Sequence, residues 1–343
     1  MAQAAGVSTA TAARALGGYG PVSHDTRDRV VTAATELGYR RNDLARAMIT
    51  GRTNTIGVVI ADIENAFFAG AVRGVTDAAR AGGYEVVLTN TDEDPEMELA
   101  ALRVLLAKRV DGIIVAPTSR EPGHLLAAQR SGCPVVLLDR RVPDLEMDTV
   151  LVDNYAATRD VVERLAAAGH RRIGMVTGGT SSGDRPRRDR PAVSTGQDRV
   201  DAYLDALRRA GARQLKRYLR TSAHTPEQAC SLMSDLLRLP SPPTAVFASD
   251  SKVALGVLKA IRTAGVTMPD DISMVAFDDA DWTSVVTPAI SVVAQPTHAL
   301  GHRAAEMLIS RMRGGAEPPR LDVMATEFIS RESVAAPAGP PPR

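Results

Sequence analysis

A short run near the start of the sequence has the residue types and spacing needed to recognise nucleic acid. Ser8 follows the turn residue Gly6 and is a good N-cap for the helix that begins beside it. Thr9, Ala10 and Arg14 would project from one end and face of that helix. A threonine hydroxyl donates, accepts or contacts a thymine methyl group, and an arginine forms a paired hydrogen bond with guanine. The run therefore indicates base reading, with a small Ala-rich helical hairpin as the alternative.

The elements around Arg14 have the order of a known DNA-binding motif. A short helix, a turn at Gly6 and a second short helix form the helix-turn-helix pattern, whose second helix enters the major groove. Ser23 caps a third predicted helix, which ends at Gly38. We expect the apolar stripe of that helix to consist of Val30, Val31, Ala34 and Leu37. The stretch 39–52 has too little apolar surface to be stable alone and would need a second copy of itself or DNA as a partner.

The distribution of charge agrees with this assignment. The 343 residues include 41 Lys+Arg and 40 Asp+Glu, a net charge of +1, so the whole chain is not a basic nucleic-acid coat. Seven arginines and four acidic residues give the first 52 residues a net charge of +3. Positive charge is thus concentrated where a phosphate backbone would lie.

Other kinds of chemistry find little support. Cys133 and Cys230 stand outside any CxxC or Cys/His cluster, which excludes a disulfide scaffold and a thiolate zinc site and favours ordinary packing. The sequence has no Ser/His/Asp set, HExxH motif, P-loop or GxGxxG in the right context. We therefore expect no enzyme, no metal and no cofactor. No apolar run approaches the ~18 residues of a membrane span, and the N-terminus does not resemble a signal peptide, so we expect a soluble cytoplasmic protein.

From Thr55 the pattern alternates between apolar runs and helical stretches. Continuous Val/Ile runs bounded by turns indicate strands buried on both faces, hence parallel sheets covered by helices. About nine such units exceed what one sheet usually holds, so we expect two doubly wound α/β lobes with a cleft between them, where ligands bind at the strand carboxyl ends. The predicted strands are 55–61, 84–89, 112–116, 134–138, 172–177, 244–248 and 272–277.

Two segments interrupt this alternation. Residues 178–197 form a long predicted loop with Arg185, Arg187, Arg188 and Arg190 close together, which is either a solvated surface loop or a lid near an anionic ligand. The Pro-rich tail 335–343 has the composition of a disordered segment and lacks an apolar heptad, so a C-terminal coiled coil is not expected.

Many short motifs in the chain resemble the lactose-repressor/galactose-repressor family of bacterial transcription regulators. Each is weak alone, but they run in order over nearly the whole chain. They are Ala5-Gly-Val-Ser8, Thr11-Ala-Ala-Arg-Ala-Leu16, Val22-Ser23, Thr26-Arg27, Glu36-Leu-Gly-Tyr39, Asn42, Ala45-Arg46, Gly51-Arg-Thr53, Ile56-Gly57, Phe67-Phe68, Arg109-Val-Asp-Gly112, Gly169-His-Arg-Arg-Ile-Gly174, Phe277-Asp-Asp279 and Thr287-Pro288.

The resemblance implies a fold class and a domain order. The fold is an N-terminal all-α helix-turn-helix domain plus an α/β two-lobed core like a periplasmic binding protein, with doubly wound parallel sheets. The helix-turn-helix domain would span 1–41, with a first helix that looks truncated. A hinge helix and linker would span 42–54, the effector-binding and dimerisation domain 55–334, and the disordered tail 335–343.

The resemblance also implies how DNA is bound. A homodimer would place two helix-turn-helix domains in the major groove of a palindromic double-stranded operator, with paired hinge helices in the minor groove. Met48 stands where the family has a leucine wedge, and such a wedge unstacks and kinks the duplex; packing against its dimer mate or the core is the alternative for Met48. Ala13, Gly17 and Arg41 depart from the family pattern, so we expect weaker phosphate contacts. The DNA-binding residues implied are Ser8, Thr9, Ala10, Thr11, Arg14, Asn42, Ala45, Arg46 and Met48.

In the family a small effector, more often a sugar than a nucleobase, binds between the lobes. Aromatic rings suit stacking on a sugar ring, and Arg and Asp pair with vicinal hydroxyls. The alternatives are helix capping for Asp250 and Asp278 and a surface-loop role for His224. The effector-binding residues implied are Phe67, Phe68, Asp139, Thr195, Arg199, His224, Ser249, Asp250 and Asp278.

The main hypothesis is therefore a ligand-responsive transcriptional repressor without a membrane partner. A periplasmic-type sugar-binding protein shares the two-lobed core, but the absence of an export signal and the presence of residues 1–52 argue against it. An α/β enzyme is a third hypothesis that no catalytic set supports.

Overall fold

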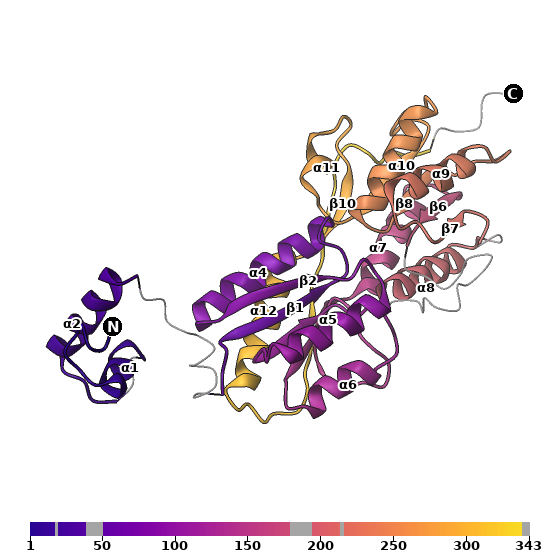
Figure 1. The fold of residues 1–343 in the computed structure, drawn as a ribbon. Coiled ribbons are helices and arrows are strands. Elements are labelled where there is room, and N and C mark those ends of the chain that lie inside the picture. Colours follow the sequence, from indigo (N-terminus) through magenta and orange to yellow (C-terminus); the bar gives the residue numbers. More distant parts are fainter. Residues whose placement is uncertain (18–19, 39–50, 179–193, 213–215, 338–343) are drawn as a thin grey trace, which may run out of the picture. The chain divides into compact units, whose positions relative to one another are not determined.

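The computed structural model divides the chain into two compact units, Met1–Thr53 and Asn54–Arg343. It describes all residues except 18–19, 39–50, 179–193, 213–215 and 338–343 (Figure 1). The predicted hinge residues Asn42, Ala45, Arg46 and Met48 lie outside the described residues, as does the arginine-rich part of the 178–197 loop.

The first unit opens with a single helical turn that Gly6 ends. Gly6 has a φ of 65°, its N–H donates to the carbonyl of Gln3, and the N–H of Val7 donates to that of Ala2. This left-handed glycine cap satisfies the carbonyls at the end of the turn. Two helices follow, α1 at Thr9–Gly17 and α2 at His24–Glu36.

Side-chain caps and small apolar residues hold these helices together. The hydroxyls of Ser8 and Ser23 accept from the backbone N–H groups of Thr11 and Thr26, as expected for N-caps. The buried cluster between the helices consists of Ala5, Ala12, Ala15, Val30 and Ala33. Small side chains allow the helices to approach closely, so a core forms in a very short domain.

The predicted apolar stripe of α2 is partly wrong. Val30 and Ala34 are buried, but Val31 is 47% and Leu37 58% exposed, and Ala33 takes a buried place. Residues 30, 33 and 34 share a face at helical spacing, whereas residue 31 lies about 100° away. Leu37 is the C-cap, beyond the last helical residue, and so falls outside the stripe.

The second unit contains two six-stranded sheets, each in its own lobe. The order in lobe 1 is β11-β5-β4-β3-β1-β2 and in lobe 2 β12-β10-β9-β8-β6-β7. All pairings are parallel except that of β12 with β10. Lobe 1 contains β1 (Thr55–Ile60), α4 (Ala66–Gly82), β2 (Glu85–Asn90), α5 (Pro95–Ala107), β3 (Gly112–Val115), α6 (Gly123–Arg130), β4 (Val135–Leu138), β5 (Asp148–Val152), α12 (Thr297–Met312) and β11 (Leu321–Met324). Lobe 2 contains α7 (Asn154–Ala167), β6 (Ile173–Val176), α8 (Ser194–Arg209), β7 (Leu219–Arg220), α9 (Pro226–Leu237), β8 (Ala245–Ala248), α10 (Ser251–Thr263), β9 (Ser273–Phe277), α11 (Asp281–Val285), β10 (Ser291–Ala294) and β12 (Glu327–Ile329).

The doubly wound α/β prediction is confirmed, and all seven predicted strands are present within a residue or two. Five strands were not predicted: β5, β7, β10, β11 and β12. Among them β7, β11 and β12 are edge strands with incomplete burial and a weaker apolar signal. The other two, β5 and β10, are buried but short, and polar residues interrupt or begin their apolar runs.

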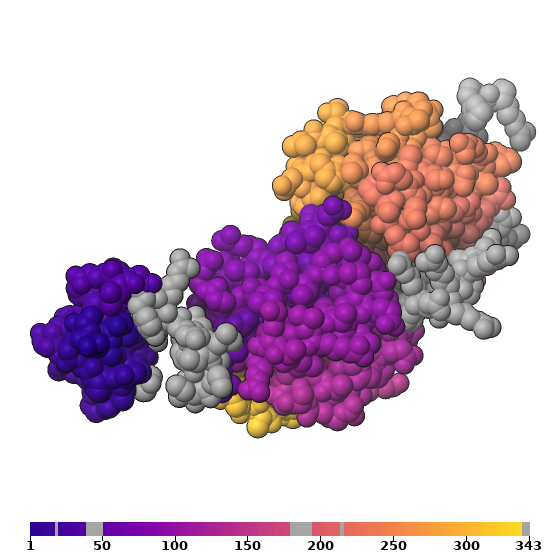
Figure 2. Space-filling model, viewed as in Figure 1, coloured from indigo at the N-terminus to yellow at the C-terminus, as the bar shows by residue number. Residues whose placement is uncertain are grey.

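The strand order fixes where a ligand site can form. In each sheet the order reverses beside the first strand of the lobe, between β1 and β3 in lobe 1 and between β6 and β8 in lobe 2. Crevices open at the carboxyl ends of the strands at such points. The chain crosses between the lobes three times, after β5, after β10 and after β11, and the lobes meet along one boundary (Figure 2).

Two helices of lobe 1 from opposite ends of the chain, α4 and α12, pack unusually close. A Cβ on Gly74 would lie 2.0 Å from the carbonyl oxygen of His298, and one on Gly301 would lie 1.8 Å from that of Ala71. Only glycine fits at these two positions. The contact attaches α12 to lobe 1 after the chain has passed through lobe 2.

The C-terminal segment is ordered further than predicted. Ala335 accepts from His170 Nε2 at 2.9 Å, and its N–H donates to Ser273 Oγ at 3.1 Å. The predicted disordered tail therefore does not begin at Ala335, because these side chains supply polar partners that composition alone does not reveal. Among the described residues, no helix is long and apolar enough to cross a membrane.

Candidate functional site

Arg199 lies at the centre of a charged cluster between the lobes. It sits on α8, is 8% exposed, and its guanidinium lies 3.8 Å over the ring of Phe277. Its Nε donates to Asn154 Oδ1 at 2.9 Å and its Nη1 to the carbonyl oxygen of Ser249 at 2.5 Å. The side chain is thus fixed from below by the ring and from two sides by hydrogen bonds. We call Arg199, Asp139, Asp250 and Asp278 the interlobe cluster.

The three carboxylates of this cluster follow three different strands. Asp139 follows β4 of lobe 1, Asp250 lies just past β8, and Asp278 follows β9, so the strand ends of both sheets contribute. Burial raises the pKa of each carboxyl group, while the charge of Arg199 lowers it; the balance is upward, and that of Asp278 reaches about 6. Burial likewise lowers the pKa of Arg199, against the attraction of these acids. The cluster is short of positive charge.

Two of these acids also have local partners. Asp250 is the N-cap of α10 and accepts from the N–H of Val253 at 2.8 Å, so the capping alternative applies to it. Asp278 caps no helix; it has a φ of 74° and accepts from Gln295 Nε2 at 2.6 Å. In the described part of the chain, Gln295 Oε1 is buried without a hydrogen-bond partner. The Oε1 atom of Gln295, beside Asp278, is thus available to accept a hydrogen bond from a ligand.

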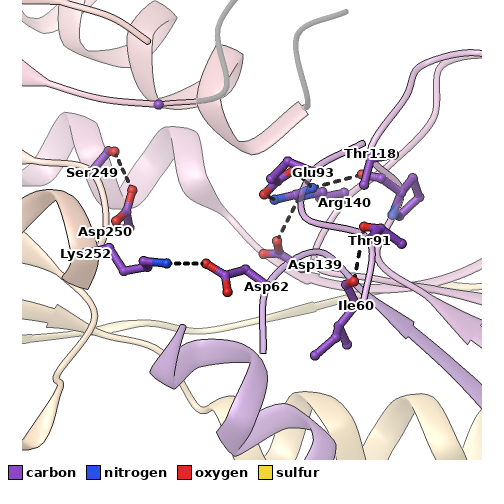
Figure 3. Close-up of polar contacts among 12 residues, drawn as sticks. Ile60, Asp62, Thr91, Glu93, Thr118, Asp139, Arg140, Ser249, Asp250 and Lys252 are labelled. Carbon is purple, nitrogen blue, oxygen red and sulfur yellow. Dashed lines mark hydrogen bonds and ion pairs between the residues drawn. The ribbon is translucent and has the colours of Figure 1, made fainter. Parts of the chain in front are cut away.

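The lobe 1 side of the region combines aromatic rings with a second arginine. Phe67 and Phe68 begin α4, are almost fully buried and pack edge to face with centroids 5.1 Å apart. The guanidinium of Arg140 lies 5.7 Å from the centroid of Phe68. Both Nη atoms of Arg140 donate to the carboxylate of Glu93, at 2.7 and 2.6 Å (Figure 3).

Ion pairs join the two lobes at the edge of the cluster. Lys252 on α10 donates to Asp62 Oδ2 of lobe 1 at 2.7 Å (Figure 3). It also lies 3.4 Å from a carboxylate oxygen of Glu64, in the same lobe. Arg141 of lobe 1 donates to Asp198 Oδ1 on α8 at 2.8 Å. Because these contacts cross the boundary between the lobes, an opening of the lobes would break them.

The remaining predicted effector residues lie in lobe 2. Thr195 is buried on α8, one turn before Arg199. Ser249 is buried, and its hydroxyl donates to Asp250 at 3.1 Å. His224 is exposed, as its surface-loop alternative supposed.

Sequence reasoning missed several residues of this region. Arg140, Asn154 and Gln295 contact the predicted residues Asp139, Arg199 and Asp278, and Glu93 contacts Arg140. A weak signal was present, because Arg140 follows Asp139 in sequence and Asn154 and Gln295 follow β5 and β10 within two residues. No spacing rule links Glu93 to Arg140, which are 47 residues apart.

The predicted base-reading residues lie at the start of α1. Ser8, Thr9 and Ala10 are exposed, Thr11 and Arg14 half-buried. The Nε of Arg14 donates to the carbonyl of Ala10 at 3.3 Å, which folds the side chain back along its own helix. In this arrangement the exposed side chains at the start of α1 are those of Ser8, Thr9 and Ala10.

Two other places in the second unit are less suited to an effector. A surface groove lined by parts of α4 and α12 lies around Gly82, Glu306 and Arg313, about four turns along α4 from Phe67. Within the described residues, no three His, Cys, Asp or Glu side chains form a metal cluster. Burial raises the pKa of the Cys133 thiol to about 11, which agrees with a packing role.

Comparisons with known proteins agree with these features. Residues 1–42 match the model of the bacterial regulatory proteins of the lacI family, and 162–334 match a periplasmic binding protein-like domain. The repressor CytR of Escherichia coli is 32% identical over 98% of this chain and 95% of its own length. A putative ribose operon repressor from Burkholderia thailandensis is 30% identical, with a TM-score of 0.70 over 81% of this chain and 99% of its own. A complex of the regulator CelR with cellobiose is 29% identical, with a TM-score of 0.72 over 97% of this chain and 98% of its own. The chain therefore belongs to the lacI family of bacterial regulatory proteins and is a transcriptional regulator.

Proposed function

We propose that this regulator binds a palindromic operator as a homodimer and acts as a repressor. The helix-turn-helix unit offers one base-reading helix, so recognition of two half-sites requires two copies related by a twofold axis. The exposed start of α1 with Thr9 and Ala10 would face base edges, and Arg14 would swing from its own helix to guanine. The residues Asn42, Ala45, Arg46 and Met48 would complete the contact in the minor groove.

We further propose that a small sugar-like effector binds at the interlobe cluster. The observation that carries this proposal is the position of Arg199, held by Asn154 and Ser249 and facing carboxylates from both lobes. Arg and Asp side chains fixed in this way form charge-assisted hydrogen bonds with vicinal hydroxyls. Phe67 and Phe68 would supply apolar surface to a sugar ring.

The relatives support the effector class. The CelR structure is titled as a complex with cellobiose, and the Burkholderia thailandensis protein as a putative ribose operon repressor. Both names concern sugars, and both proteins share the core fold with this chain. The cluster contains hydroxyl-binding groups on both lobes, so we expect a bound sugar to change the relation between the lobes and, through the 42–54 segment, operator affinity.

The test uses the full-length chain with DNA and candidate ligands. Selection from random duplexes should return a palindrome, and binding to it should weaken as salt rises because basic groups contact phosphates. A thermal-shift screen of sugars and nucleosides should yield at least one ligand that raises the melting temperature and alters operator affinity. Arg199→Ala should bind the operator with unchanged affinity but lose the ligand response, whereas Arg164→Ala, an exposed arginine on α7, should keep both. Equal ligand response in the two variants would remove Arg199 from the site.

A further inference from the structure

Arg140 is an arginine whose anion-binding surface is already occupied. Glu93 accepts from both of its Nη atoms, and Nη1 also donates to the carbonyl oxygen of Pro117 at 3.1 Å. The remaining Nε lies 3.4 Å from a carboxylate oxygen of Asp139 but, in the described part of the chain, is buried without a hydrogen-bond partner. The fork of a guanidinium is the usual receptor for carboxylates and phosphates. In this chain a side chain of the protein fills that receptor.

The backbone around Glu93 holds the carboxylate in place. Asp92 and Glu93 both adopt left-handed conformations, with φ of 50° and 59°; aspartate tolerates this region, but glutamate rarely uses it. The N–H of Glu93 donates to the carbonyl of Ala61 at 3.2 Å, and Asp94 caps the next helix, α5. A strained turn fixed at both ends thus aims Glu93 at Arg140. Burial alone would raise the pKa of Glu93, but the charge and hydrogen bonds of Arg140 hold it below its usual value.

The charges around Arg140 and Glu93 also disfavour an anionic ligand. Among the described residues, the positive groups that pair with acids in this region are Arg140, Arg141, Arg199 and Lys252. Seven acidic groups accompany them: Asp62, Glu64, Glu93, Asp139, Asp198, Asp250 and Asp278. An added carboxylate or phosphate would meet an excess of negative charge at low dielectric. Hydroxyl groups, in contrast, donate to carboxylates without adding charge.

We propose that Glu93 is a specificity-determining residue that restricts the effector site to uncharged polyhydroxyl ligands, excluding sugar acids and sugar phosphates, by occupying the guanidinium fork of Arg140. This inference rests on the proposed effector site. It names the class of effector and gives Arg140 a role: with Glu93 in place it is a neutralised pair beside Phe68, and without Glu93 it is an anion receptor.

The experiment compares neutral ligands with anionic derivatives of the same compounds. Calorimetry on the full-length chain would use D-ribose and D-ribose 5-phosphate, D-glucose and D-glucuronate, cellobiose and cellobionate, and adenosine and AMP. The chain should bind at least one neutral probe at least 100-fold more tightly than its charged counterpart. Glu93→Gln keeps the shape of the side chain but removes its charge. It should reduce the ratio of the neutral to the anionic affinity at least tenfold, because the anion binds more tightly. Neutral binding should change less than threefold.

Two control variants separate the contact from general electrostatics. Glu96→Gln removes the same charge from an exposed position three residues away and should leave the ratio unchanged. Glu93→Asp retains a negative charge beside Arg140 and should keep most of the discrimination, which also provides a folded variant if Glu93→Gln is unstable. Operator binding by each variant reports its fold.

The outcomes separate the proposed role of Glu93 from the proposed sugar-like effector on which it rests. If the unmodified chain binds an anionic probe as tightly as its neutral counterpart, the restriction is wrong and the effector site stands. If Glu93→Gln and Glu96→Gln change the ratio equally, Glu93 has no specific role. If no probe of either kind binds while the operator does, the proposed sugar-like effector is wrong, and the inference falls with it.

Discussion

Lys252 of lobe 2 donates from Nζ to Asp62 Oδ2 of lobe 1 at 2.7 Å, next to the strand ends that form the interlobe cluster. Each side chain is about a quarter exposed, so solvent screens the pair only in part. The pair stabilises the arrangement of the lobes in which the cluster is assembled. Its energy therefore bears on ligand binding more than on folding.

Replacement of Lys252 by Gln should weaken effector binding about three- to tenfold, because the assembled arrangement becomes less populated. The free energy of unfolding should change by less than about 1 kcal/mol, as for other partly exposed ion pairs. Calorimetry and urea unfolding measure the two quantities. Lys259→Gln, on the same helix, is the matched control and should alter neither. Equal effects of both substitutions on affinity would show that charge alone, not the bridge, is responsible.

Arg14→Ala should relax base preference at one position of each half-site at a cost of about 1–3 kcal/mol on the preferred sequence. The reason is that a guanidinium distinguishes guanine from other bases, whereas a phosphate contact does not. Binding to a library of single-base operator variants measures this effect. A uniform loss on every variant would assign Arg14 to the phosphate backbone.

The stability of the chain should depend on pH through Asp278. Its pKa is about 6 in the folded state, against an ordinary value near 4, so the folded state binds the extra proton between these pH values. The protonated Asp278 carboxyl group thus contributes fully to the free energy of unfolding below about pH 4, and this contribution is lost as pH rises through 6. Asp278→Asn should therefore raise the free energy of unfolding at pH 7.5 by on the order of 2 kcal/mol and leave it little changed at pH 4.

Urea unfolding across this pH range tests the effect, with Asp235→Asn as a control on the exposed end of α9. The control should show no pH-dependent gain. A gain for Asp278→Asn that is the same at both pH values would contradict the assigned pKa. The same substitution should weaken effector binding, because a hydroxyl loses a charged acceptor.

Gly301→Ala should destabilise the second unit strongly, by about 1–3 kcal/mol or more, because its Cβ would lie 1.8 Å from the backbone oxygen of Ala71. Helices α4 and α12 would have to move apart. Gly123→Ala at the start of α6 is the matched control, since a Cβ there meets nothing within 4 Å. It should be neutral or slightly stabilising. Thermal unfolding compares the two, and equal melting temperatures would refute the close helix contact.

The sequence by itself determined the class of fold and the positions of seven strands, most of them inside the sheets. Runs such as 55–61 and 272–277 are buried on both faces, so the same continuous apolar signal that predicts a parallel strand also predicts its burial. It located Asp139, Asp250 and Asp278 at strand ends, and Ser8 and Ser23 as helix caps, because these features depend on neighbours only a few residues away.

The tertiary structure decided which of these residues meet. Glu93 and Arg140 come together over 47 residues, and Lys252 reaches Asp62 over 190, distances at which no local pattern operates. The edge strands β11 and β12 join their sheets only after the chain has crossed between the lobes, so their pairing depends on the assembled sheet rather than on their own residues. Ala33 replaces Val31 in the core of the first unit because helix phase, rather than hydrophobicity, selects the buried face. Short-range signals thus fix the elements, whereas the charge balance around Arg199 exists only once two sheets face each other.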